Sequence, residues 1–148
     1  MAQPKADLSQ RPIVRPFEPA HIDPARDLWR ETEHMCLGSA DGPEALRVFL
    51  RRNRGFSFVA LEEGRLVGTC LGGHDGRRGH LYHLAVARTH RRSGLGTRLV
   101  ERCLDALREA GIGKCHAFVT RESPYGELFW KPAGWDRRDD MYVCSIRT

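Results

Sequence analysis

The residues of this sequence best suited to chemistry form a short basic segment that runs into two spaced glycines. Residues 76–100 contain six arginines and no aspartate or glutamate, although the whole chain carries a net charge of only +5. Such a segment is expected to bind an anion. Arg91, Gly94 and Gly96 follow an apolar run, residues 80–86, and precede a second apolar segment. A turn of this kind points backbone N–H groups and the positive end of a helix dipole at one place, and glycine lets a ligand approach the backbone. The pattern predicts a phosphate-binding turn.

Two regular elements must hold this turn in place. Residues 80–86 (HLYHLAV) predict a buried strand. After the glycines, apolar residues recur with the period of a helix that stops at Gly111 and Gly113, and they are Leu95, Leu99, Cys103, Leu107 and Ala110. Residues 115–120 predict another strand. The segment 80–120 is therefore expected to form a right-handed βαβ unit with parallel strands.

The remaining elements predict one mixed sheet. Pro16 restricts the strand at 13–17 to a sheet edge. Asp23 with Pro24 opens a helix that extends to Met35, and residues 41–43 (DGP) open a second helix through Arg52. The further expected elements are a hairpin at 56–61 and 65–71, a flexible loop at 72–79, a short helix from 123 to about 131, and closing strands at 135–138 and 141–146. We expect an α/β fold with a mixed sheet and about four flanking helices.

Length and composition favour one intracellular domain. A chain of 148 residues can bury an ordinary core, with residues 1–11 as a disordered lead-in and 12–148 as a single domain. The five cysteines show neither paired zinc-ligand spacing nor a disulfide framework, so we expect reduced thiols, no metal and a cytoplasmic location. No apolar run approaches the length of a membrane span, so no membrane association is expected.

Three motifs in order resemble one family. Residues 91–96 (RRSGLG) match the (Arg/Gln)-x-x-Gly-x-(Gly/Ala) motif of the GNAT superfamily of N-acetyltransferases. Residues 128–135 (LFWKPAGW) are similar to its second motif, LFYEKLGF, and residues 67–79 leading into HLYHLAV resemble small bacterial members. The order of expected strands and helices agrees over nearly the whole chain. The resemblance implies a GNAT fold.

The resemblance also implies acetyl-CoA (coenzyme A) as cosubstrate. Its pyrophosphate would bind at the glycine turn, and its pantetheine would form strand-like bonds with the preceding strand. The implied cofactor-binding residues are Leu84, Ala85, Val86, Arg91, Arg92, Ser93, Gly94, Leu95, Gly96, Thr97, Ser123 and Trp130. No metal and no covalent intermediate are required. The amine would attack the thioester directly, with a backbone N–H near Leu84 stabilising the oxyanion.

The implied general base is a histidine. His80 aligns with the catalytic glutamate of histone-type members, and residues 80–86 are similar to the HLHALAV stretch of serotonin N-acetyltransferase, where histidines relay the proton. Strict alternation places His80, Tyr82, Leu84 and Val86 on one face of the strand and His83 on the other. We favour His80 over His83 as proton acceptor. A purely structural histidine, bonded to the backbone at a strand end, is the alternative for His80.

The implied general acid departs from the family pattern. Trp130 aligns with the tyrosine that protonates the CoA sulfur, and an indole N–H donates a hydrogen bond but not a usable proton. The thiol of CoA has an ordinary pKa of about 8.5, so it can leave as a thiolate assisted by water, Tyr125 or Tyr142. Ser123 stands where the family commonly has asparagine. The candidate catalytic residues are therefore His80, Tyr82 and Tyr125.

The resemblance implies transfer of an acetyl group from acetyl-CoA to a primary amine in a ternary complex. Two alternatives stay open: acetylation of a peptide or protein, at an N-terminus or a lysine, and a non-catalytic acyl-CoA-binding module. Nucleic-acid binding is disfavoured because the arginines concentrate at one turn without interleaved aromatics. The sequence does not identify the acceptor amine, although Asp41, Glu44 and Glu127 could attract a cation. A homodimer through the closing strands is a further expectation.

Overall fold

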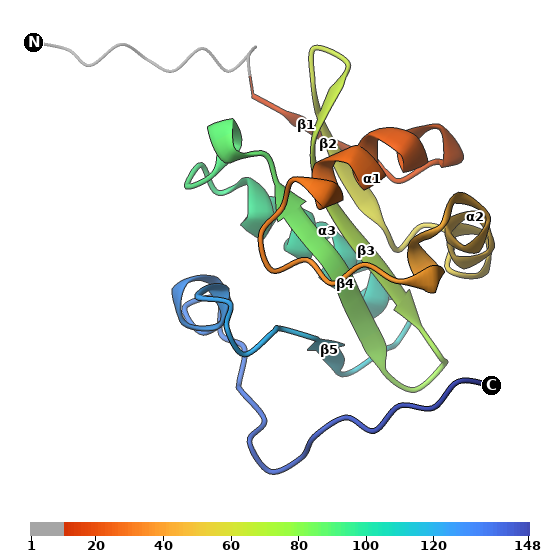
Figure 1. Ribbon diagram of the computed structural model, residues 1–148, viewed down its shortest axis with the longest axis vertical. Helices are drawn as coiled ribbons and strands as arrows, with labels where there is room; N and C mark the ends of the chain where they lie inside the picture. Colours follow the sequence, from red (N-terminus) through yellow and green to blue (C-terminus); the bar gives the residue numbers. More distant parts are fainter. Residues whose placement is uncertain (1–10) are drawn as a thin grey trace, which may run out of the picture. The chain divides into compact units, whose positions relative to one another are not determined.

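A computed structural model describes residues 11–148 of this chain. The chain divides into two compact units, one that ends at Phe118 and one that spans Val119–Thr148. The first unit contains a five-stranded sheet in the order β1-β2-β3-β4-β5 (Figure 1). Its strands are β1 (Ile13–Pro16), β2 (Phe58–Glu62), β3 (Arg65–His74), β4 (Gly79–Val86) and β5 (Cys115–Ala117). Neighbouring strands are antiparallel except β4 and β5, which are parallel. The predicted mixed α/β sheet is confirmed.

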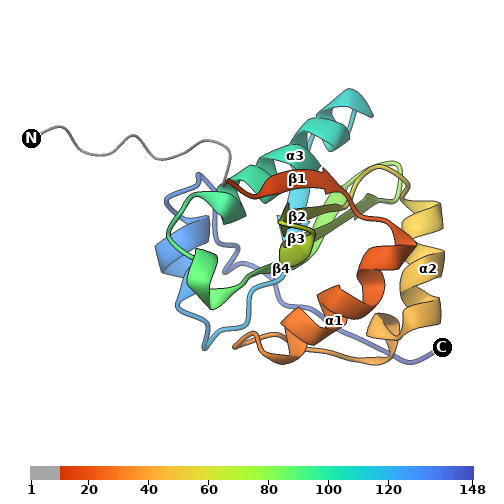
Figure 2. The ribbon, with the colours of Figure 1, turned by 90° about the horizontal axis from the view of Figure 1, so that it is seen from above.

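Helices cover both faces of this sheet (Figure 2). The α-helices are α1 (Ile22–Arg30), α2 (Pro43–Arg52) and α3 (Leu95–Glu109), and the short 3₁₀ turns are η2 (Pro19–His21), η3 (Ser39–Asp41) and η4 (Arg88–His90). On one face, α1 and α2 pack over a core that comprises Phe17, Ile22, Ala25, Trp29, Leu46, Leu50, Val59, Leu71 and Ala85. On the other face, α3 packs so closely that Cβ atoms added at Gly68 and Gly79 would lie 2.9 and 2.7 Å from Leu99 and Leu107.

Trp29 links α1 to two strands through a chain of hydrogen bonds. Its side chain is only 1% exposed. The indole Nε1–H donates to Thr69 Oγ1 over 2.8 Å, and this hydroxyl donates to the backbone carbonyl of His83 over 2.8 Å. A buried indole N–H and a buried hydroxyl both need such partners. The three groups satisfy one another and fix His83 relative to α1 and β3.

A β-bulge interrupts β4 at this point. Thr69 pairs with Ala85 but Leu71 pairs with Tyr82, so His83 and Leu84 together lie opposite Cys70. The backbone of His83 is left-handed, with a φ of 49°. An extra residue of this kind shifts every later side chain to the other face of the strand.

The bulge makes the predicted strict alternation along β4 wrong. Tyr82 contacts Phe49 of α2, and the His83 ring contacts Trp29 of α1, so both lie on the α1/α2 face together with Ala85. Val86 pairs with Gly68, which faces α3. His83 therefore shares a face with Tyr82, whereas Val86 does not.

Several predicted boundaries change. The edge strand, the hairpin, α2, α3 and the parallel βαβ unit are confirmed, but the last strand of that unit ends at Ala117 rather than at residue 120, and residues 72–74 belong to β3 rather than to a loop. The first helix ends at Arg30, before Met35. Thr32 donates its hydroxyl to the carbonyl of Leu28, and His34 adopts a left-handed φ of 61°, both of which favour helix termination over continuation.

The second unit contains one π-helical turn, η5 (Gly126–Trp130), within the helix predicted from 123 to about 131. The predicted closing strands at 135–138 and 141–146 are wrong for the part of the chain that the structure describes, where no strand follows β5. The apolar side chains of that segment, Met141, Tyr142, Val143 and Ile146, are exposed. Alternating apolar residues form a strand only when a neighbouring strand pairs with the backbone, and the sequence pattern cannot supply that neighbour.

None of the helices within residues 11–148 combines the length and apolar character needed to cross a membrane.

A close approach between backbones yields the first testable prediction. A Cβ at Gly72 would lie 2.2 Å from the carbonyl oxygen of Phe56. Gly72→Ala is therefore expected to lower the free energy of unfolding by about 2–3 kcal/mol, because β3 and the segment just before β2 must separate. A Cβ at Gly113 would meet no atom within 4 Å, so Gly113→Ala is the matched control and should change stability by less than about 1 kcal/mol. Urea denaturation of both variants makes the comparison, and equal stabilities would contradict the packing described here.

Candidate active site

The edge of β4 opens toward the C-terminal end of the strand. β5 pairs with β4 only at Gly79, His80 and Leu81, and it ends at Ala117. From Tyr82 to Val86, no strand in the described part of the chain lies on that side of β4. An extended ligand can add to such an edge through backbone hydrogen bonds. The predicted residues Leu84, Ala85 and Val86 all lie along it.

The chain then makes a turn that leads into α3. Two residues of this turn are left-handed, Arg92 with a φ of 59° and Gly94 with a φ of 80°. The first backbone bond of α3 runs from Arg98 N–H to Gly94 O over 3.1 Å, and no side chain caps the helix. The preceding helical amides have no hydrogen-bond partner among residues 11–148, and they belong to Leu95, Gly96 and Thr97.

These amides and the nearby arginines suit an anion. The first N–H groups of a helix carry the positive end of its dipole, and α3 is 15 residues long. Ser93 closes the turn by donating its hydroxyl to the carbonyl of His90. Arg91 donates its Nε–H to the carbonyl of Val86 over 3.0 Å, which ties the turn to the end of β4. The turn predicted from the sequence is therefore present, with its N–H groups uncapped.

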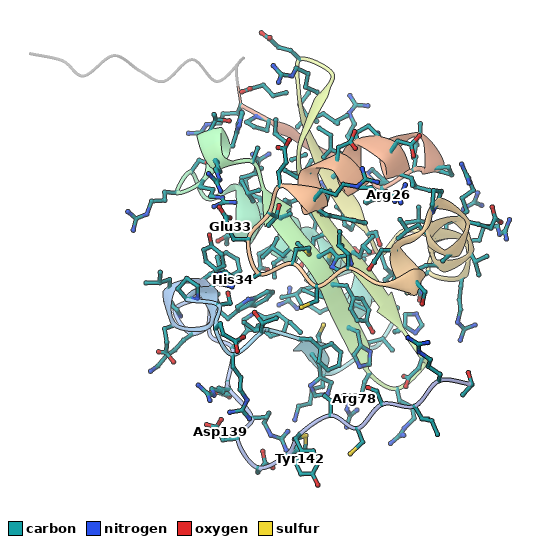
Figure 3. The ribbon with its side chains drawn as sticks, in the orientation of Figure 1. Arg26, Glu33, His34, Arg78, Asp139 and Tyr142 are labelled. Carbon is teal, nitrogen blue, oxygen red and sulfur yellow. The ribbon has the colours of Figure 1, made fainter. Side chains whose placement is uncertain are left out.

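A carboxylate already lies against the arginines of this turn. Glu33, in the segment that follows α1 (Figure 3), forms ion pairs with Arg88 and, over 3.0 Å, with Arg91. Hydrogen bonds from its own backbone N–H and from Arg91 lower the pKa of Glu33 from 4.5 to about 2. The two arginines thus pair with a carboxylate of this chain. No sequence pattern indicated this pairing, because 55 and 58 residues separate the partners.

His80 and Tyr82 belong to a cluster of aromatic rings. The His80 ring stacks on Tyr82 at 6.1 Å and on Phe118 at 6.2 Å, and it lies 5.7 Å from the ring of His116. Tyr82 and Phe118 are 36% and 61% exposed, so these two aromatic side chains of the cluster are accessible to solvent. Burial, and to a lesser degree Cys115, raises the pKa of Tyr82. Its phenol is therefore a hydrogen-bond donor at neutral pH, and His80 has no hydrogen-bond partner among the described residues.

His83 has a different environment. Its Nε2 lies 2.6 Å from Asp41 Oδ1, and the two side chains are only 14% and 15% exposed. The ring also contacts Trp29, with the centroids 4.6 Å apart. Asp41 ends η3, and its other carboxylate oxygen accepts the N–H of Gly38 over 2.8 Å. The sequence singled out both residues but did not pair them, because they are 42 residues apart.

A small cavity adjoins this pair. Its volume is about 170 Å³, and it is lined by Arg26, Trp29, Arg30, Leu37, Gly38, Ser39, Asp41 and Gly42. Trp29 and Asp41, which both contact His83, are part of its wall. Arg26 holds the wall in place by donating its Nε–H to the carbonyl of Asp41 over 3.0 Å. The cavity is therefore polar on one side and borders the bulge of β4 through these two residues.

The remaining predicted residues lie in the second unit. Ser123 accepts the backbone N–H of Tyr125 over 3.3 Å. Trp130 packs edge-on against Phe129 and Trp135, with centroids 5.1 and 4.8 Å away. The roles predicted for Ser123, Tyr125 and Trp130 stay predictions.

Comparison with known proteins identifies the class. Residues 22–135 match the model of the Acetyltransferase (GNAT) family. The matched segment includes the open edge of β4, the uncapped turn and α3. This chain belongs to the GNAT family of acetyltransferases.

Individual relatives agree with this assignment. An acetyltransferase of Sodalis glossinidius is 36% identical over 89 residues, which are 60% of this chain and 63% of that protein. A crystal structure of an acetyltransferase from Streptococcus agalactiae has a TM-score of 0.75 at 18% identity, covering 94% of this chain and 93% of that one. Aminoglycoside N-acetyltransferase AAC(6')-Iy, solved in complex with CoA, also has a TM-score of 0.75, at 14% identity, covering 99% of this chain and all of the other. The structural matches show the shared fold. The chain spans less than two thirds of the length of the curated relatives it matches.

The ion pairs of Glu33 predict a pH-dependent stability. Because the pKa of Glu33 in the folded protein is about 2, against an ordinary 4.5, its carboxylate stabilises the fold above about pH 4.5 and loses this effect as the pH falls toward 2. Glu33→Gln should therefore be less stable than the wild type at pH 6, and the difference should narrow between about pH 5 and 3.

Glu31→Gln is the matched control, since Glu31 is exposed and lies two residues away with no ion pair in the described part of the chain. Urea denaturation across this pH range measures all three proteins. A constant difference between the wild type and Glu33→Gln, or equal behaviour of the two variants, would contradict the pairing.

Proposed function

We propose that this protein transfers an acetyl group from acetyl-CoA to a primary amine by direct attack within a ternary complex. One observation carries the proposal: the uncapped N-terminus of α3, flanked by arginines, directly follows a strand whose edge is unpaired. Acetyl-CoA has a pyrophosphate joined to an extended pantetheine arm, so it needs an anion site next to an unpaired strand edge. The N-terminus of α3 and the open edge of β4 are consecutive along the chain.

The residues present fit acetyl-CoA. The amides of Leu95, Gly96 and Thr97 would hold the pyrophosphate, with Arg91 and Arg92 adding charge. The edge formed by residues 84–86 would bond with the pantetheine, and the N–H of Leu84, beside the bulge, would stabilise the oxyanion. When bound, the cosubstrate supplies an activated thioester. AAC(6')-Iy, which shares this fold, was solved with CoA, and this supports the assignment.

Two cysteines with raised pKa values support direct transfer rather than an acylated thiol. A hydrogen bond with Cys103, together with burial, raises the pKa of the Cys70 thiol well above its usual value. Burial raises the pKa of Cys115 to about 11. Since the thiolate is the nucleophilic form, neither cysteine is activated for attack at neutral pH.

The acceptor proposed here is a small primary amine. The carboxylate of Asp41 on the cavity wall would attract the ammonium group of the acceptor. A cavity of about 170 Å³ accommodates a small amine-bearing group rather than part of a folded protein. AAC(6')-Iy, an N-acetyltransferase of aminoglycosides, supports an amine acceptor for this fold. Cytoplasmic location, a homodimer, and catalytic roles for His80, Tyr82 and Tyr125 stay predictions.

A pair of glycine variants tests the phosphate site. Gly94 and Gly111 are both left-handed, with φ of 80° and 78°, and they lie at opposite ends of α3. Gly94→Asp places a carboxylate where the pyrophosphate is expected, and its repulsion should weaken acetyl-CoA binding at least about tenfold. Gly111→Asp carries the same backbone strain and should bind as the wild type. Calorimetric titration with acetyl-CoA gives the dissociation constants, and equal loss in both variants would mean that strain, not charge, is responsible.

Turnover is then tested with an amine panel and a free-thiol reagent. The panel contains a polyamine, an aminoglycoside, free lysine and a short peptide with an unblocked N-terminus. At least one amine should raise thiol release from acetyl-CoA above the amine-free rate. Tight binding of acetyl-CoA without release for any amine would identify a non-catalytic acyl-CoA-binding module and refute the proposal.

A further inference from the structure

We propose that His83, oriented by Asp41, accepts the proton of the acceptor ammonium, so that His83 is the catalytic base and Asp41 its positioning residue. The proposal rests on the proposed acetyl transfer to an amine. It changes the residue that the sequence favoured for this step, which was His80.

The contact with Asp41 fixes the chemistry of the His83 ring. An ionised carboxylate only accepts hydrogen bonds, so the ring nitrogen 2.6 Å from Asp41 Oδ1, Nε2, must carry a proton. In the neutral ring, the lone pair is then on Nδ1. Among residues 11–148, no group hydrogen bonds with Nδ1. Nδ1 is therefore the atom that can take up a proton from a bound amine.

The ring is held rigidly. Asp41 is itself fixed, since Oδ2 accepts the N–H of Gly38 and the Asp41 carbonyl accepts from Arg26. Trp29 packs against the ring and, through Thr69, also fixes the backbone carbonyl of His83. Around the ring, Asp41 is the charged group in contact, and Arg26 is the cation that bonds to Asp41. A base held in this way loses little freedom when it binds a proton.

The backbone of His83 is also unusual. A non-glycine residue with a φ of 49° within a strand is strained, and such strain persists only where neighbours enforce it. The bulge serves two purposes at once. It places the ring of His83 against Trp29 of α1 and against Asp41, and the next residue, Leu84, lies on the open edge of β4. The proposed base and the proposed oxyanion donor are thus consecutive residues.

His80 lacks these features. Its ring stacks on Tyr82 and on Phe118, which also stack on each other, and no carboxylate orients it within the described residues. An aromatic stack positions the plane of a ring but does not select which nitrogen carries the proton. The structure therefore favours His80 as part of the apolar wall formed with Phe118.

Proton uptake by His83 precedes formation of the amide. Nδ1 of His83 removes one proton from the ammonium, and the amine nitrogen then attacks the carbonyl carbon of the thioester. A C–N bond forms and the C–S bond breaks, with its electron pair leaving on sulfur. The nitrogen loses a second proton, which neutralises the thiolate, and His83 returns the first proton to water. One amide, one thiol and one released proton result, and no oxidant or metal is consumed.

Four single variants test which residue is the base, with the panel amine that gives the highest rate as the acceptor. His83→Asn keeps a residue that tolerates a left-handed backbone, and Asp41→Asn keeps the shape of the side chain. His34→Asn is the matched control, because His34 (Figure 3) is exposed and has a similar φ of 61°. His80→Asn tests the rival base. The readouts are kcat, the KM for acetyl-CoA, the pH profile of kcat/KM, and the tautomer of each labelled histidine by ¹⁵N NMR.

In His83→Asn we expect kcat to fall about 100-fold or more, while the KM for acetyl-CoA is unchanged. In this variant, kcat/KM should no longer decrease as the pH is lowered. His34→Asn should match the wild type. In the wild type, NMR should show the proton of neutral His83 on Nε2. Asp41→Asn should move it to Nδ1, because the new amide N–H₂ faces Nε2 as a donor, and kcat should fall with it.

A His83→Asn enzyme that folds and retains more than about a third of the wild-type kcat would overturn the proposal, and so would a wild-type His83 protonated on Nδ1. Loss of activity in His80→Asn with retention in His83→Asn would restore His80 as the base. Absence of turnover by the wild type with every amine would refute the proposed function itself, and the base assignment with it. Binding of acetyl-CoA by the wild type shows that the protein is folded, so that absence of turnover cannot be attributed to misfolding.

Discussion

The rest of the site depends on the two hydrogen bonds of the Thr69 hydroxyl. It accepts a hydrogen bond from the indole of Trp29 and donates one to the carbonyl of His83. This small network holds the extra residue in β4 while the register of β3 shifts beside it. Because the indole and the hydroxyl are buried, loss of the Thr69 hydroxyl would leave the indole N–H of Trp29 without a partner in the core. The position of the bulge is therefore determined by packing between α1 and the sheet.

The features proposed for function lie on either side of this bulge. Residues 79–81 of β4 are paired on both sides, whereas from Tyr82 onward the edge on the side of β5 is open because β5 ends at Ala117. The open edge leads directly to the uncapped amides at the start of α3. On the α1/α2 face, the bulge brings His83 against Asp41, which lines the small cavity. The proposed binding edge for the cosubstrate and the proposed catalytic histidine therefore meet at one local irregularity of β4.

The segment between α1 and α2 contributes a carboxylate to each half of this arrangement. Glu33 pairs with Arg88 and Arg91 beside the turn, and Asp41 pairs with His83 near the cavity. An incoming pyrophosphate would compete with Glu33 for the same arginines. The proposed cosubstrate site and the small cavity therefore share residues of one segment, 31–42.

The sequence predicted the features that local patterns encode. Gly94 and Gly96 after an apolar run, followed by a helical period, identified the turn and α3, and the motif at 91–96 identified the family. The bulge escaped prediction because residues 80–86 alternate as smoothly as any regular strand, and the extra residue exists only relative to Cys70 on the neighbouring strand. The pairs of Glu33 and Asp41 escaped for a similar reason, since their partners lie more than forty residues away. The closing strands were predicted from alternation alone, without a neighbouring strand to pair with.

Hydrogen exchange of the backbone amides, measured with and without acetyl-CoA, tests the proposed cosubstrate site. Acetyl-CoA is expected to slow exchange at two consecutive places, the edge of β4 from Leu84 to Val86 and the helical amides of Leu95, Gly96 and Thr97. These amides should be protected together and at the same ligand concentration, because one molecule contacts both. Binding of acetyl-CoA that leaves both sets of amides unchanged, or that protects only distant residues, would contradict the proposed site.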